Sequence, residues 1–112
     1  MDSILTSIKK LLGITEEYEY FDVDVIMNIN AAFSVLRQLG VGPDEGFSIT
    51  DSSAVWTDFL SDDTRLELVK TYVYLKVKLT FDSTSLTSGV IDSINRQISE
   101  LEWRINVIAE EE

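Results

Sequence analysis

Two pairs of closely spaced carboxylates are the residues best suited to metal chemistry. Asp22 and Asp24 precede one apolar-periodic segment, and Asp62 and Asp63 precede another. Carboxylate oxygens are ligands that Mg²⁺ and Ca²⁺ prefer. Neither pair has the spacing of a calcium-binding loop, and an aspartate ahead of such a segment is most simply a helix cap that interacts with the helix dipole. We therefore predict no metal and no cofactor.

The other side chains of catalysis are scarce. The chain contains no histidine and no cysteine, which removes the commonest general base and all thiolate chemistry. It also has no lysine-containing phosphate loop, no Gly-x-Gly-x-x-Gly run and no serine placed in a nucleophile elbow. No catalytic residue is assigned, and we predict that the protein is not an enzyme.

Aromatic and acidic residues are interleaved between positions 16 and 22. The aromatic residues Tyr18, Tyr20 and Phe21 lie among Glu16, Glu17, Glu19 and Asp22. This composition suits a recognition segment, but aromatic residues in a connector also pack against the core and hold the connector in place. Both interpretations stay open at this point.

The C-terminal part of the chain carries more apolar surface than one helix contact needs. Six residues recur at intervals of three and four, which defines one seam: Ile91, Ile94, Ile98, Leu101, Ile105 and Ile108. At roughly 1.5 to 3 kcal/mol each when buried, they suffice to dock the helix. Trp103 and Val107 fall on the opposite side. Either the N-terminal helix or the 40–53 loop covers them, or another polypeptide does.

The charged neighbours of Trp103 fit an interface. A tryptophan beside Arg96, Glu100 and Arg104 has the composition of an anchor residue with a charged rim. Glu100 is also four residues from each arginine, so pairing within the helix explains the same charges without a partner.

Length and charge narrow the remaining functions. With 112 residues, 45% of them hydrophobic, residues 1–112 are expected to form one domain with a sizeable core. The longest apolar-rich stretch, 69–81, contains three lysines, and no signal-peptide pattern precedes it, so we expect neither a membrane span nor a secretory signal. The 20 acidic and 9 basic residues give a net charge of −11, which opposes binding to the phosphate backbone of DNA.

Apolar spacing and capping residues predict a small all-α bundle of four to five helices. Helices are expected over residues 2–13, 22–39, 54–60, 64–81 and 90–109, with a structured loop at 40–53 and a break at 82–89. Within the loop we expect a short extended piece at Phe47 and Ile49, and a helix cap at Asp51 or Ser52. The acidic residues 110–112 oppose the helix dipole and are expected to fray.

Residues 64–81 have an ambiguous pattern. From position 72 onward apolar and polar residues alternate as in a half-buried strand, yet the segment has no Gly or Pro and exceeds the usual strand length, which favours a helix. Such a helix has two apolar strips: Leu68, Tyr72, Leu75 and Leu79 on the first strip, and Leu66, Val73, Val77 and Phe81 on the second strip. It is either central in its bundle or shared with a neighbouring molecule.

Several segments, in this order, resemble the head-tail connector (adaptor) proteins of tailed bacteriophages. They are residues 11–14 (LLGI), 24–42, 56–60 (WTDFL), 69–82 and 95–107, and the most specific parts are 29–32 (INAA), 38–40 (QLG), 72–82 and 97–104 (QISELEWR). Residues 82–85 (DSTS) lack the proline expected in this turn of the family. The likeness covers nearly the whole chain.

The resemblance implies a structural virion protein that is made in the host cytoplasm and located at the head-tail interface. Such subunits assemble as a ring, about twelve-fold to match the portal, under the portal vertex. The implied partners are the portal protein and the next head-completion or tail-completion protein. DNA passes through the ring without being bound specifically, and no membrane is involved.

Eight residues are expected to bind partner chains. A ring with head-to-tail contacts needs two different adhesive surfaces on each subunit, and the resemblance implies further contacts by the C-terminal segment and the long loops. They are Trp103, Val107, Arg104 and Ile108 in the last helix, Phe47 and Ile49 in the loop, and Val77 and Phe81 on the second strip. The alternative function is a small acidic binding module, such as a DNA-mimic inhibitor of a nucleic-acid-binding protein. Ring formation would favour the first function, and a one-to-one complex with such a protein would favour the second.

Overall fold

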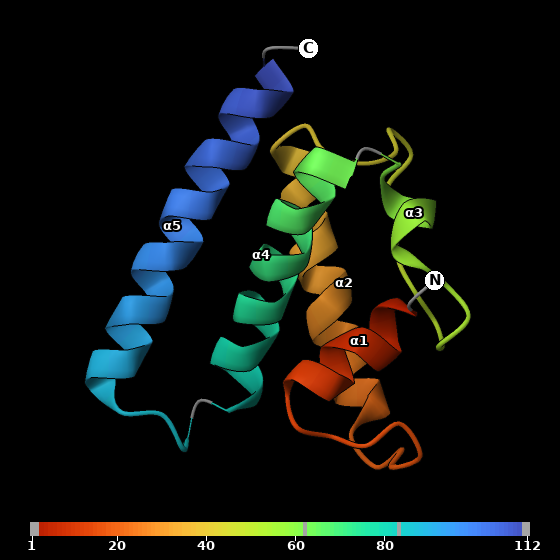
Figure 1. Cartoon of the computed structure of the whole chain (residues 1–112), viewed down its shortest axis with the longest axis vertical. Coiled ribbons are helices and arrows are strands. Elements are labelled where there is room, and N and C mark those ends of the chain that lie inside the picture. The colour runs from red at the N-terminus through yellow and green to blue at the C-terminus, as the bar shows by residue number, and fades with distance from the viewer. Residues whose placement is uncertain (1–2, 62, 83, 111–112) are drawn as a thin grey trace.

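The computed structural model describes residues 3–61, 63–82 and 84–110, and these residues form an all-α fold (Figure 1). Five helices follow one another in the described chain: α1 (Ile4–Leu11), α2 (Asp22–Gln38), α3 (Trp56–Phe59), α4 (Asp63–Phe81) and α5 (Ser88–Glu110). The predicted helical bundle is confirmed, and the segment with the alternating pattern is a helix. Of the acidic tail that we expected to fray, Glu111 and Glu112 lie outside the described residues.

Helix α4 occupies the centre of the fold. It packs against α2 on one side and α5 on the other, while α1 crosses α2 and α3 lies at the far edge (Figure 1). The core is made of apolar residues from all five helices and the 40–53 loop, among them Ile8, Ile29, Phe33, Leu36, Ile49, Trp56, Val69, Tyr72, Val73, Val77 and Ile98. Helix α5 is therefore peripheral, because α4 is its main neighbour.

A buried ion pair holds the connector between α1 and α2. The ammonium group of Lys9 is almost fully buried, lies 2.8 Å from Oδ1 of Asp22 and donates a hydrogen bond to the carbonyl of Glu16 at 3.0 Å. The expectation that Asp22 caps α2 is wrong, because Phe21 occupies the cap position and Asp22 is the first helical residue. Its carboxylate still lies in the first turn, where the helix dipole favours negative charge.

Side chains of α2 position the 40–53 loop. The side-chain amide of Asn30 donates to the carbonyl of Ile49 at 3.0 Å and accepts from the N–H of Ile49 at 2.8 Å. Both backbone groups of Ile49 are therefore bonded to a side chain instead of to a neighbouring strand. The guanidinium of Arg37 donates to the carbonyl of Asp44 at 2.8 and 3.1 Å. Gly42 has φ +99°, and a Cβ there would lie 2.4 Å from the Phe59 ring. The loop can therefore close on the core only with glycine at this position.

One expectation for this loop is wrong, and another stays a prediction. Residues 47–49 have no strand partner in the described structure, and Asn30 bonds the backbone of Ile49. Asp51 does not cap α3, because its carboxylate accepts hydrogen bonds from the N–H and hydroxyl of Ser53. At the N-terminal end of α3, the N–H of Val55 donates a hydrogen bond to Oδ2 of Asp58 at 3.0 Å.

Candidate assembly surfaces

Helix α5 docks on the bundle through the predicted seam. Ile94, Ile98, Leu101 and Ile105 are buried, and the two outer members, Ile91 and Ile108, are half-buried. Polar bonds supplement this contact at two points. The hydroxyl of Tyr72 on α4 donates to Glu102 Oε2 at 2.7 Å, and the amide of Asn106 donates to the carbonyl of Leu39 at 3.3 Å.

The hydrogen bond between Tyr72 and Glu102 joins α4 to α5 and requires that the Tyr72 phenol be protonated. Burial of the Tyr72 hydroxyl, and then its hydrogen bond to the Glu102 carboxylate, raise the pKa of Tyr72 well above its usual value. The phenol is protonated at neutral pH, and its hydrogen bond links α4 to α5.

The side of α5 opposite the seam is not covered by the chain itself. The Trp103 side chain is 68% exposed, and Arg96, Glu100 and Arg104 around it are exposed as well. Val107 is half-buried, so it contributes less surface than its position on the helix predicts. Neither the N-terminal helix nor the 40–53 loop buries the indole. The role of Trp103, Arg104, Val107 and Ile108 in binding another chain stays a prediction.

The second strip of α4 does not form a second surface. Leu66, Val73 and Val77 are buried, because α4 has packed neighbours on both sides. Phe81 at the end of the strip is half-buried, with its ring centroid 5.1 Å from that of Phe21 in an edge-to-face contact. The expectation that Val77 faces a partner is therefore corrected: α4 is central in its own subunit.

The two candidate residues in the 40–53 loop are also turned inward. Ile49 is buried and held by Asn30. Phe47 is half-buried, with edge-to-face contacts to Phe33 at 5.1 Å and to Phe59 at 5.4 Å between ring centroids. Their main environment is the core of the same subunit, so they offer a partner little surface.

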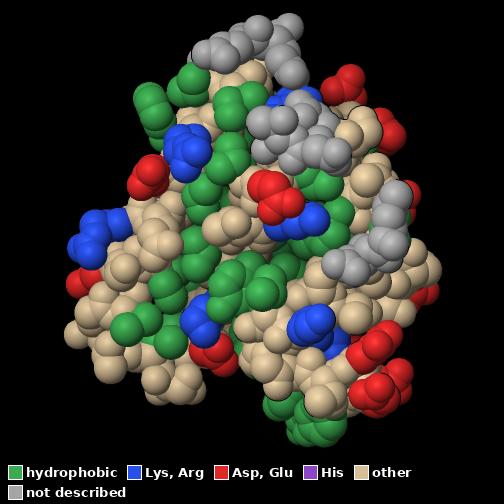
Figure 2. Space-filling view, in the orientation of Figure 1, with side chains coloured by type: hydrophobic (Ala, Val, Ile, Leu, Met, Phe, Trp, Pro, Cys, Tyr) green, Lys and Arg blue, Asp and Glu red, His purple; other side chains and the backbone are tan. Residues whose placement is uncertain are grey.

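The connector between α1 and α2 supplies an exposed surface instead, and we call it the acidic aromatic end. Phe21 packs inward on Phe81, whereas Tyr18 and Tyr20 are 51% and 78% exposed. The packing interpretation is confirmed for Phe21, whereas recognition of a partner by Tyr18 and Tyr20 stays a prediction. At this end of the molecule Figure 2 shows hydrophobic and acidic side chains next to each other.

The first turns of α2 extend the acidic aromatic end, and the sequence reasoning missed them. Val23 is exposed and Met27 is 66% exposed. A shallow groove of about 490 Å³ lies beside Met27 and is lined by Phe21, Asp24, Met27, Asn28, Thr80 and Phe81. The signal in the sequence was that Val23 and Met27 are four residues apart and fall outside the apolar face that α2 presents to the core.

The comparisons with known proteins identify a family for this chain. The family model for phage connector protein matches residues 4–112. The chain belongs to the phage connector protein family. No curated protein and no solved structure matches it.

Membership of the phage connector family confirms the resemblance seen in the sequence. The protein is a structural phage connector protein that associates with other components of the virion. The family is a structural one, which favours the assembly function over a small inhibitor of nucleic-acid-binding proteins.

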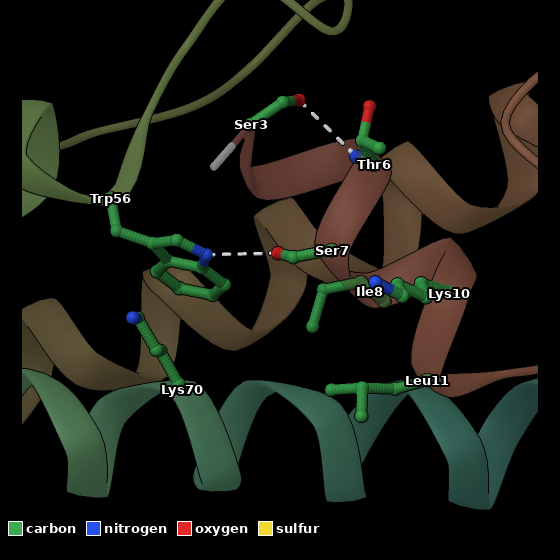
Figure 3. Close-up of a pocket in the computed structure, with 8 residues that line it drawn as sticks. All are labelled: Ser3, Thr6, Ser7, Ile8, Lys10, Leu11, Trp56 and Lys70. Carbon is green, nitrogen blue, oxygen red and sulfur yellow. Dashed lines mark hydrogen bonds between the residues drawn. The ribbon is translucent and has the colours of Figure 1, made fainter. Parts of the chain in front are cut away.

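A separate pocket of about 420 Å³ lies between α1, α4 and Trp56 of α3 (Figure 3). It is lined by Ser3, Thr6, Ser7, Ile8, Lys10, Leu11, Trp56 and Lys70. The Ser7 hydroxyl accepts from the Trp56 indole at 2.9 Å, and Ser3 accepts from the N–H of Thr6 at 3.2 Å. The lining includes no carboxylate and no imidazole that could act as a base. Both serine side chains accept hydrogen bonds from groups of the same fold.

The pair Asp22 and Asp24 belongs to no metal-binding cluster in the part of the chain that the structure describes. Asp22 is paired with Lys9, and Asp24 is exposed beside the groove. Asp62, and the side chain of Asp63, lie outside the described residues. Among the residues that are described, no group of three or more acidic, histidine or cysteine side chains is placed to hold a metal ion. None of the described helices is both long and apolar enough to cross a membrane.

Proposed function

We propose that the protein forms a ring of about twelve copies beneath the portal vertex, where it joins the capsid to the tail and surrounds the path of the DNA. Its partners are further copies of the same chain, the portal protein and the next completion protein on the tail side. The protein acts at the head-tail interface of the virion after synthesis in the host cytoplasm.

The exposed indole of Trp103 is the observation that supports assembly most directly. The seam of α5 already docks this helix, so the fold of one subunit gains little from a tryptophan on the outer side. A tryptophan with an arginine on either side along the helix is the composition of an interface anchor. Family membership supports the same role, since a connector must bind its neighbours.

The charge of the subunit suits a conduit for DNA. With a net charge of −11 per copy, carboxylates that face the channel would repel phosphates and let the duplex slide. We expect no binding of duplex DNA in an electrophoretic mobility assay, even at low salt. Tight binding at low salt would contradict a repelling channel.

Mass measurement of the assembly tests the proposed ring. Native mass spectrometry across a concentration series, with the chain alone and with purified portal rings, should show a discrete oligomer with one copy of this chain for each portal subunit. Persistent monomers under both conditions, or a one-to-one complex with a nucleic-acid-binding protein, would contradict the proposal.

A further inference from the structure

The exposed aromatic residues of the described chain lie in two places of opposite charge. Tyr18 and Tyr20 lie in the acidic aromatic end, where Glu16, Glu17, Glu19 and Asp24 are exposed too. Trp103 lies on α5 with the exposed residues Arg96, Glu100 and Arg104, whose charges sum to a net positive value, and we call this the Trp103 face. Two of the nine basic residues of a strongly acidic chain thus flank its one exposed tryptophan.

The arginines of the Trp103 face are available to a partner. Pairing with Glu100 within the helix would have explained them, but no described carboxylate lies within ion-pair distance of Arg96 or Arg104. An unpaired guanidinium beside an exposed indole favours a surface that carries carboxylates and apolar groups.

The acidic aromatic end has these properties and is held rigidly. The Tyr20 ring packs edge-to-face on Phe21 at 4.9 Å, and Phe21 packs in the same way on Phe81 at 5.1 Å. Lys9 ties down both ends of the connector through the Glu16 carbonyl and the Asp22 carboxylate. Because these groups are already ordered, a partner that docks here loses little free energy in ordering them.

Charge also decides how two copies would meet. A symmetric contact between two acidic aromatic ends brings carboxylates together and is opposed by repulsion, whereas the Trp103 face, with two arginines and Glu100, carries a net positive charge. The contact between the Trp103 face of one copy and the acidic aromatic end of another copy is attractive. Because the two surfaces lie on different parts of the molecule (Figures 1 and 2), one copy can use both at once.

We propose that the Trp103 face of one copy docks on the acidic aromatic end of the next copy. The indole enters the groove beside Phe21, Met27 and Phe81, and the arginines face Asp24 and the connector glutamates. This proposal rests on the proposed ring and names the contact that builds it: a head-to-tail interface that closes by rotation.

Two single variants test whether both halves are needed. Trp103→Ala and, separately, Met27→Asp should each raise the concentration needed for ring formation roughly 30-fold, the effect of losing an interface anchor. Both side chains are exposed in the monomer, so circular dichroism should show unchanged helicity. Val90→Asp is the matched control, because it places the same charge on an exposed apolar position outside both surfaces. If either test variant assembles like wild type, the proposal is wrong.

Cross-linking tests which surfaces meet, and the chain offers a clean background because it has no cysteine. Copies with Asp24→Cys are mixed with copies carrying Arg104→Cys, under conditions where the wild-type ring forms, and treated with a short bismaleimide. We expect mixed pairs to exceed like pairs and to exceed pairs made with a Val90→Cys control. An excess of like pairs, or yields no higher than the control, would overturn the head-to-tail contact.

The outcomes separate this inference from the proposed function. If wild type forms no ring, alone or on the portal, the proposed function fails and the inference fails with it. If rings form but the cross-links are absent, only the inference fails. If Trp103→Ala loses portal binding but still self-associates like wild type, the portal covers the Trp103 face and the inference is likewise overturned.

Discussion

Helices α4 and α5 both carry apolar residues on more than one side, but they have different neighbours. α4 lies between α2 and α5, and the buried residues Leu66, Val73 and Val77 fill its second strip. α5 has α4 as its main neighbour, so its seam is covered while Trp103 faces outward. The same sequence feature is thus core in one helix and exposed surface in the other.

The difference shows what an apolar pattern can and cannot specify. Periodicity identifies which side chains share a side of a helix, whereas the number of packed neighbours decides which sides are covered. In a bundle of this size one helix can be surrounded, and the terminal helix is left with one open side. Surplus apolar residues on a terminal helix are therefore better evidence for an interface than surplus apolar residues on a central one.

The largest effect should come from a charge in the second strip of α4. We expect Val77→Asp to lower the free energy of unfolding by about 4 kcal/mol or more, because a carboxylate would be buried there without a partner. Val90→Asp in the first turn of α5 should leave the free energy of unfolding nearly unchanged, since that position is exposed and the helix dipole favours the charge. Urea unfolding measures both. Equal effects would remove the distinction between the two helices.

The next largest effect should come from the seam of α5. Ile105→Ala removes buried methylene groups and leaves a cavity against α4, which should cost roughly 2 to 4 kcal/mol in the same urea experiment. Leu11→Ala, at an exposed apolar position of α1, serves as the control and should change the unfolding free energy by less than about 0.5 kcal/mol. A small loss for Ile105→Ala would mean that α5 is only loosely attached.

The sequence was sufficient for the elements and for the exposed tryptophan, but not for the other surface. The apolar periods located the helices, and the extra apolar residue on the outer side of the last helix indicated Trp103, whereas the caps expected for α2 and α3 were wrong. Val77 was misjudged because periodicity does not count neighbours. Ile49 was misjudged because its hydrogen-bond partner, Asn30, is 19 positions away in the chain, and only the folded structure brings the two residues together.

The acidic aromatic end shows a further limit of sequence reasoning. Phe21 and Tyr20 are adjacent and aromatic, yet one packs on Phe81 and the other is exposed. Only the path of the connector, fixed by the buried Lys9, separates them. A residue that contacts two distant groups in this way has no local signature in composition or spacing.

A smaller effect is expected at the polar link between the two helices. Tyr72→Phe removes the hydrogen bond to Glu102 and should cost about 1 kcal/mol, with little change in packing. Because the pKa of Tyr72 is raised in the folded state, its contribution is complete below the unfolded value of about 10 and is lost as the pH rises above it. The difference between wild type and Tyr72→Phe should therefore shrink in thermal unfolding between about pH 9 and pH 11. A constant difference would show that the phenol is not shielded.

The smallest effect on stability should come from the outer side of α5. Trp103→Ala combined with Val107→Ser should change the unfolding free energy by no more than about 1 kcal/mol, most of it from the half-buried valine. Helicity should be unchanged, while self-association or portal binding measured by native mass spectrometry should weaken strongly. The contrast with Ile105→Ala is what matters, since both variants truncate apolar residues of one helix and only the seam variant should unfold the monomer. If the outer variant instead lowered stability as much as the seam variant, the indole would be part of the subunit's own core and α5 would not differ from α4.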